Sequence, residues 1–143
     1  MSDALERAAL RLREAGETHS PCAPIRDLIP PTDVASAYAV QEINTKYWLG
    51  RGRKLVGRKI GLTAVAVQQQ LGVDQPDYGV LFADMEYLSG AELPAQKLIQ
   101  PKAEGEIAFV VGRDLDQPDL TWSRFLLGLE YALPAIEIVD SAI

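Results

Sequence analysis

Residues 103–111 read Ala103-Glu104-Gly105-Glu106-Ile107-Ala108-Phe109-Val110-Val111, an apolar run that two acidic side chains interrupt. A second apolar run, Leu133-Pro134-Ala135-Ile136-Glu137-Ile138-Val139, holds one further glutamate. Short apolar runs of this kind predict β-strands. Because side chains alternate between the two faces of a strand, Glu104 and Glu106 are expected to point the same way. The two runs therefore predict strands that bring three carboxylates together.

Three converging carboxylates repel one another unless protons or a cation neutralise them. Two unit charges about 4 Å apart repel by roughly 4 kcal/mol at an effective dielectric constant of about 20, so three pairs would cost on the order of 10 kcal/mol. That figure is comparable with the stability of a whole domain. Oxygen ligands select hard ions, so Glu104, Glu106 and Glu137 are candidate ligands of Mg²⁺, Mn²⁺ or Ca²⁺ in a dry pocket.

A plainer interpretation of the Glu-x-Glu pattern is a strand with one wet face. That strand would expose both glutamates and turn Ile107, Phe109 and Val111 inward. Glu137 favours the metal site, because apolar residues flank it on both sides and such surroundings suit a solvated acid poorly.

Composition bounds the remaining possibilities. The chain has 143 residues, 48% of them hydrophobic and 24% charged, which predicts one soluble globular domain. The net charge of −6 argues against nucleic acid as a partner. Neither a bilayer-spanning run nor a signal peptide is evident, so we expect no membrane partner and a cytoplasmic location. Cys22 and His19 are each the only residue of their type, which argues against disulfides, cysteine-rich zinc sites and His-dependent nucleophilic catalysis.

The pattern along the chain predicts an α+β protein, with a helical region over residues 1–53 and a β-rich region over 54–143. Helices are expected over 3–15, ended by Gly16, and from a cap at Thr32 or Asp33 to about Leu49. Short helices are expected after Thr63 and, capped by Thr121, over 122–129, where Phe125, Leu126 and Leu129 would face inward. Residues 55–62 and 133–139 are expected to be strands, and residues 74–79 a turn.

Lys59 and Asp77 are two further candidates for chemistry. Lys59 shares one strand face with Gly57 and Gly61, so a ligand could approach it closely. Most lysines are solvated surface charges, but a half-buried lysine near carboxylates can hold an anion or exchange protons. Asp77 follows Pro76 and is simplest as a turn residue, although Tyr78 and Gly79 beside it would let it reach a pocket.

Two longer motifs resemble a known family. They read Gly57-Arg58-Lys59-Ile60-Gly61-Leu62-Thr63 and Val67-Gln68-Gln69-Gln70-Leu71-Gly72-Val73-Asp74-Gln75-Pro76-Asp77-Tyr78-Gly79. With the two glutamate runs, they resemble the 2-keto-4-pentenoate hydratases of the fumarylacetoacetate hydrolase-like superfamily, from Leu5 to Ile143. The resemblance implies a fumarylacetoacetase-like fold and a homo-oligomer. Family chains continue well beyond the position of Ile143, so further C-terminal strands of that fold are expected to be missing here.

The resemblance also implies a reaction. A divalent ion, Mg²⁺ or Mn²⁺, would be held by Glu104, Glu106 and Glu137. Lys59 and Asp77 match the active-site lysine and aspartate of the family and would form an acid–base pair. The substrate would be a small 2-hydroxy- or 2-oxo-dienoic acid, 2-hydroxypenta-2,4-dienoate, which gains water to give 4-hydroxy-2-oxopentanoate in aromatic meta-cleavage catabolism.

Three alternatives stay open. The related 4-oxalocrotonate decarboxylases share the metal-site motif, although Arg58 and the run Gln68-Gln69-Gln70 are more typical of a hydratase. A truncated, non-catalytic relative would keep the fold without turnover. A purely structural Ca²⁺ site would use the same glutamates for stability alone.

Overall fold

The computed structural model describes residues 2–143, and these form four α-helices and four β-strands. In chain order the elements are α1 Asp3–Thr18, α2 Val34–Gly50, β1 Leu55–Gly61, α3 Val65–Leu71, β2 Asp77–Phe82, β3 Pro101–Val111, α4 Trp122–Gly128 and β4 Leu129–Asp140. Single turns of 3₁₀ helix lie at Ile25–Asp27, Ala83–Met85 and Ala95–Lys97. The α+β class that the sequence predicted is confirmed.

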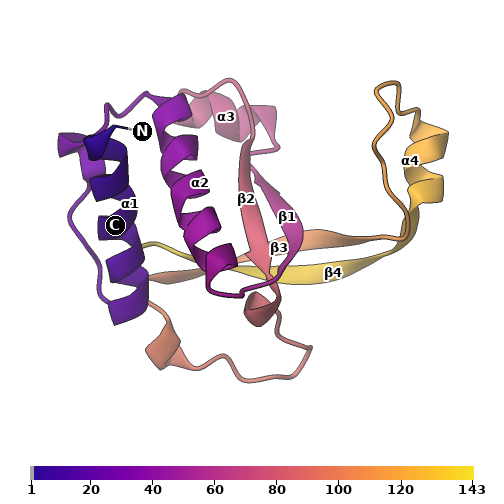
Figure 1. Cartoon of the computed structure of the whole chain (residues 1–143). Coiled ribbons are helices and arrows are strands. Elements are labelled where there is room, and N and C mark those ends of the chain that lie inside the picture. The colour runs from indigo at the N-terminus through magenta and orange to yellow at the C-terminus, as the bar shows by residue number, and fades with distance from the viewer. Residues whose placement is uncertain (1) are drawn as a thin grey trace.

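Helices α1 and α2 lie side by side (Figure 1), and a cluster of buried apolar side chains lies between them. Ala8 and Ala9 on α1 meet Val40 on α2, and all three are buried. The two alanines let the helix backbones approach closely, and partly buried apolar residues close the rim: Leu5, Leu12, Ile25, Leu28 and Ile43. Asn44 donates a hydrogen bond of 2.9 Å to the Ala9 carbonyl, which ties α2 directly to the α1 backbone.

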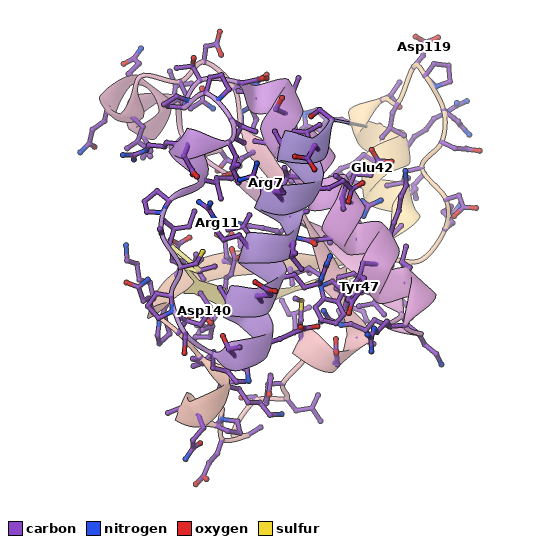
Figure 2. The ribbon with its side chains drawn as sticks, turned by 60° about the vertical axis from the view of Figure 1, so that its left-hand side comes forward. Arg7, Arg11, Glu42, Tyr47, Asp119 and Asp140 are labelled. Atoms are coloured by element: carbon purple, nitrogen blue, oxygen red, sulfur yellow. The ribbon has the colours of Figure 1, made fainter. Side chains whose placement is uncertain are left out.

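Arg11 fastens the loop between the two helices to α1. Its guanidinium donates to both carboxylate oxygens of Asp27, at 2.7 and 2.9 Å, and to the Pro24 carbonyl at 3.1 Å. Figure 2 shows Arg11 on the side of α1 next to this loop. The hydrogen bond from Arg11 holds the pKa of Asp27 below its ordinary value, since it favours the ionised carboxylate.

Side-chain caps set two helix starts as the sequence predicted. Asp33 precedes α2 and accepts a 3.0 Å hydrogen bond from the Ser36 amide, and Thr121 precedes α4 and accepts one of 3.3 Å from the Arg124 amide. The predicted start of α3 at Thr63 is wrong, because the helix begins at Val65 with Ala64 as its N-terminal flank.

The predicted end of the first helix at Gly16 is also wrong. Helix α1 continues to Thr18, and His19 ends it with a left-handed backbone, φ 51°. The Ser20 amide then donates to the Ala15 carbonyl at 3.1 Å. A glycine is the usual residue for this conformation, but a histidine also adopts it at a moderate cost.

The strands pair into two antiparallel sheets, β1 with β2 and β3 with β4. Strand β2 already begins at Asp77, so the prediction of a turn through residue 79 is wrong: Asp77 pairs with Gly61 and extends the ladder. Strand β4 is longer than predicted at both ends, because its pairing with β3 runs from Leu129 to Asp140.

The β1–β2 sheet has two different faces. Val80 and Phe82 lie on the face toward α2, and Phe82 is only 3% exposed. Residues of the opposite parity, Lys59 and Asp77 among them, lie on the other face. Helix α2 therefore covers one side of this sheet and leaves the other side for the candidate chemistry.

The β3–β4 ribbon is long, and α4 stands at the end of it that lies away from α1 and α2 (Figure 1). The loop before α4 reaches its tip near Asp119 (Figure 2). Ile107 is 66% and Phe109 is 51% exposed, so the inward orientation that the wet-face interpretation expects for them is wrong. The inward orientation expected for Leu126 is wrong as well, since it is 60% exposed.

Within residues 2–143, none of the helices combines the length and the apolar character that crossing a membrane would require.

Candidate functional site

The three predicted metal ligands meet on one face of the β3–β4 ribbon. In the antiparallel register Glu104 lies directly opposite Glu137, and Glu106 lies two residues further along β3, opposite Ala135. Each glutamate offers a carboxylate oxygen, and these oxygens all lie within 4.8 Å of one another. The alternation that the sequence predicted for Glu104 and Glu106 is therefore realised, and strand pairing supplies the third carboxylate.

The surroundings of these carboxylates are wetter than the sequence predicted. Glu104 and Glu106 are exposed, and the Glu137 side chain is 23% exposed. The expected dry pocket is therefore wrong for two of the three residues as they lie here. Water screens much of the repulsion between these carboxylates. Their electrostatic repulsion is therefore smaller than the value on the order of 10 kcal/mol expected for an enclosed cluster.

The donor set nevertheless fits a divalent cation. Hard cations bind carboxylate oxygens at roughly 2.0–2.6 Å, so one ion can contact three oxygens that are this close together. Lys59 brings a single positive charge to the cluster, whereas three ionised glutamates carry three negative charges. A doubly charged ion would balance the remaining negative charge.

Lys59 reaches this cluster from the other sheet. Its Nζ atom lies 3.2 Å from Oε1 of Glu137, which joins β1 to β4. The two side chains are 28% and 23% exposed, so the pair is half-buried and less screened than a surface ion pair. Lys59 thus meets the condition set for a lysine that could hold an anion or exchange protons, since it is half-buried and lies beside a carboxylate.

Asp77 lies on the same face of the β1–β2 sheet as Lys59. It starts β2 opposite Gly61, and Lys59 lies opposite Gly79 one step further along the ladder. A methyl group built on Gly61 would collide with the Asp77 carboxylate and lie 3.3 Å from Lys59 Nζ. The acidic and the basic group therefore border one small space above Gly61, next to the glutamate cluster that Lys59 contacts.

Two residues of α2 hold the backbone beside Asp77, and the sequence offered no reason to expect this role for them. The Tyr78 amide donates to the Tyr38 hydroxyl at 3.0 Å, and Gln41 donates to the Tyr78 carbonyl at 3.0 Å. Tyr38 and Gln41 are three residues apart and so share one face of α2. This three-residue spacing was the only sign in the sequence that the two residues could act together. It indicates a binding face only when β2 is known to lie beside that face of α2. The amide and the carbonyl of Tyr78, on this edge strand, are thereby both paired.

The exit of β1 is strained. Leu62 follows Gly61 with φ 55°, a left-handed conformation that side chains other than glycine rarely adopt. The Leu62 carbonyl accepts a hydrogen bond of 2.6 Å from Gln68 on α3. Gln68, which the sequence analysis used only as a family cue, thus holds the turn that follows Lys59 and Gly61.

A separate cavity of about 400 Å³ lies between α2 and β2. Its wall includes Val40, Trp48, Arg53 and Phe82, but none of the five predicted site residues. It is mostly apolar and lies on the other side of the β1–β2 sheet from Lys59. The glutamate cluster with Lys59 and Asp77 therefore remains the candidate site on chemical grounds.

Comparison with known proteins confirms the predicted resemblance. Over 138 residues the chain is 57% identical to 2-keto-4-pentenoate hydratase 2 of Dechloromonas aromatica, which covers 96% of this chain and 53% of that protein. It is 56% identical over 140 residues to the TodF product hydratase of Pseudomonas putida, covering 98% of this chain and 52% of the relative. The chain thus spans about half the length of the curated relatives it matches. No protein-family model matches it.

The chain also resembles solved structures in its fold. The chain superimposes on 4-oxalocrotonate decarboxylase from Pseudomonas putida G7, complexed with magnesium and adipate, with a TM-score of 0.87 and 30% identity, over 96% of this chain and 52% of the other. The calcium and acetate complex of the same enzyme gives a TM-score of 0.88, with 98% and 54% covered.

Proposed function

From this similarity to the 2-keto-4-pentenoate hydratases, we propose that the chain carries the metal and proton-transfer site of a hydro-lyase with a fumarylacetoacetase-like fold. The observation that carries the proposal is the convergence of Glu104, Glu106, Glu137 and Lys59 from two sheets. The proposed reaction adds water to 2-hydroxypenta-2,4-dienoate to give 4-hydroxy-2-oxopentanoate. The sequence identity of 57% to a named hydratase, against 30% to a decarboxylase, favours hydration.

Glu104, Glu106 and Glu137 would hold a divalent ion, Mg²⁺ or Mn²⁺. When bound, such an ion acts as a Lewis acid and orients an oxygen-rich substrate. The three carboxylates offer one oxygen each, so they would leave coordination positions for substrate and water. The magnesium and the calcium in the complexes of the similar decarboxylase support a hard divalent ion.

Lys59 and Asp77 would move the protons. The dienol becomes an unsaturated ketone when its 2-hydroxyl loses a proton and C5 gains one. Water then adds its oxygen at C4 and a proton ends on C3, which consumes one water and releases nothing. Asp77 is exposed and would accept and return protons, while the Lys59 ammonium would stabilise the negative charge that develops on the 2-oxygen.

A direct assay tests the proposal. Loss of dienoate absorbance would be followed with the full chain and added Mg²⁺, and the product would be identified as 4-hydroxy-2-oxopentanoate. Turnover that needs the metal is expected. A folded, metal-loaded protein that leaves the dienoate unchanged would instead support the non-catalytic alternative.

Decarboxylation of 4-oxalocrotonate is the second candidate, because the solved structures that match the chain at TM-scores of 0.87 and 0.88 belong to such an enzyme. Release of CO₂ from 4-oxalocrotonate, measured beside dienoate hydration on one preparation, separates the two reactions. Faster hydration is expected.

We also propose a homo-oligomer in the cytoplasm. Exposed apolar side chains on the ribbon and on α4 support assembly, among them Ile107, Trp122, Leu127 and Ile136, which are 66–76% exposed. Light scattering of the purified chain tests the oligomeric state separately from the reaction.

A further inference from the structure

The face of the β1–β2 sheet that carries Lys59 and Asp77 has an unusual composition. Each of these residues lies directly opposite a glycine: Lys59 opposite Gly79, and Asp77 opposite Gly61. Neither charged side chain therefore has a side chain directly opposite it on the partner strand. We propose that Gly61 and Gly79 are positioning residues, which set the location of the Lys59 ammonium and the Asp77 carboxylate. This inference rests on the proposed function for its catalytic meaning.

The space above Gly79 is filled by the stem of Lys59. A methyl group on Gly79 would lie 2.8 Å from both Cγ and Cδ of Lys59, closer than real Cβ contacts allow. The position of Cγ is set by χ1, so relief requires a different χ1 rotamer rather than a small adjustment of the chain end. A changed χ1 carries Nζ away from Glu137 Oε1, which it now approaches to 3.2 Å.

The space above Gly61 is shared by both functional groups. A methyl group there would collide with the Asp77 carboxylate and lie 3.3 Å from Lys59 Nζ. Glycine at this position therefore leaves the room that the Asp77 carboxylate fills, and it lets that carboxylate lie near the Lys59 ammonium. Neither glycine has a positive φ, so the reason for glycine at both positions is space and not backbone conformation.

Gly57 provides a matched control on the same strand and face. A methyl group on Gly57 would lie 3.6 Å from Leu81 Cδ1, which is an ordinary van der Waals contact. Gly57→Ala therefore makes the same chemical change two residues from Lys59 without touching its stem.

The first measurement does not depend on turnover. In protein with ¹³C-labelled lysine, the ε-CH₂ signal of Lys59 is assigned by its absence in Lys59→Arg. We expect Gly79→Ala to shift this signal toward that of solvated lysines and Gly57→Ala to leave it in place. The other four lysines report whether each variant is folded. An unshifted Lys59 signal in folded Gly79→Ala would overturn the positioning role.

The second measurement is kinetic. Gly79→Ala is expected to lower kcat by about 10–100-fold, as misplaced catalytic groups do, while KM and the Kd for Mg²⁺ change less than about twofold. Unchanged kcat, or equal losses in Gly57→Ala, would contradict the proposal. If the unsubstituted chain turns over nothing, the proposed function fails, and the Lys59 signal still decides the positioning role.

A folding failure is also informative. Should Gly79→Ala not fold, Lys59→Ala combined with Gly79→Ala removes the Cγ and Cδ atoms that the methyl group meets. The double variant is then expected to fold. A double variant that stays unfolded would show that Gly79 acts independently of Lys59, which overturns the inference.

Discussion

Glu104 and Glu137 lie directly opposite each other in the β3–β4 ladder, so two carboxylates of like charge form one cross-strand pair. Such pairs destabilise a sheet, whereas most cross-strand pairs support it. An ion bound between the strands would turn the same pair into a crosslink. Stability and metal binding are therefore expected to respond in opposite directions when one member of the pair is neutralised.

Glu104→Gln tests this opposition. Without metal the variant is expected to melt roughly 1–4 °C higher than the unsubstituted chain, because a like-charge pair of about 0.2–1 kcal/mol is removed. With excess Mg²⁺ the order should reverse, because the metal stabilises only a protein that binds it. Thermal melts with EDTA and with Mg²⁺ measure both effects, and equal metal-induced shifts in the two proteins would contradict the site.

Glu106→Gln is expected to weaken Mg²⁺ or Mn²⁺ binding by at least about tenfold, since the variant loses one of three anionic oxygen ligands. Isothermal calorimetry measures the affinity. Glu130→Gln is the matched control, because Glu130 lies in β4 outside the glutamate cluster. A metal affinity that the two substitutions lower equally would show only a general charge effect.

Lys59→Met is expected to spare metal binding and to lower turnover by about 100-fold or more, since Lys59 contacts Glu137 as a counter-charge but offers an ion no ligand oxygen. Asp77→Asn should behave in the same way. Metal affinity by calorimetry and dienoate consumption are compared for both. Loss of metal binding in Lys59→Met would contradict the division of roles between the lysine and the glutamates.

The stability of the fold should fall in acid. Hydrogen bonds from Arg11, Ser36 and Arg53 lower the pKa values of Asp27, Asp33 and Asp84, whose ordinary value is 3.8. A carboxylate with a lowered pKa stabilises the fold above the unfolded pKa, and this contribution is lost as the pH falls through the folded pKa.

Urea unfolding between pH 6 and pH 3 measures this loss. Asp33→Asn keeps an N-cap acceptor but removes the titrating group, so part of the loss should disappear in that variant. Asp119→Asn, at the tip of the loop before α4, is the control (Figure 2). An acid response that Asp33→Asn leaves unchanged would show that this cap does not contribute to it.

Val40→Ala is expected to destabilise the chain by about 1.5–3 kcal/mol, because Val40 is 2% exposed between the two alanines of α1 and its loss leaves a cavity. Val34→Ala is the control in the same helix, since Val34 is 47% exposed and should cost less than about 0.5 kcal/mol. Chemical denaturation at neutral pH compares them, and equal losses would show that the α1–α2 core is not closely packed.

Local patterns in the sequence were sufficient for the class of fold and for much of the site. Caps at Asp33 and Thr121 act within three residues, and strand alternation places Glu104 and Glu106 on one face, so both follow from short segments. The glycines beside Lys59 could also be identified from the sequence, because Gly57 and Gly61 lie on the same strand as Lys59. None of these features requires knowing what packs against them.

Tertiary structure decided the rest. Strand register placed Glu137 opposite Glu104, and packing of the two sheets brought Lys59 to within 3.2 Å of Glu137. The hydrogen bonds of Tyr38 and Gln41 with the Tyr78 backbone join segments about forty residues apart. The errors about exposure share one cause: whether Leu126 or Phe109 is buried, or Glu106 is dry, depends on which surface covers it. Such contacts between distant segments are set by the free energy of the whole fold, whereas periodicity and caps are set within a few residues of chain.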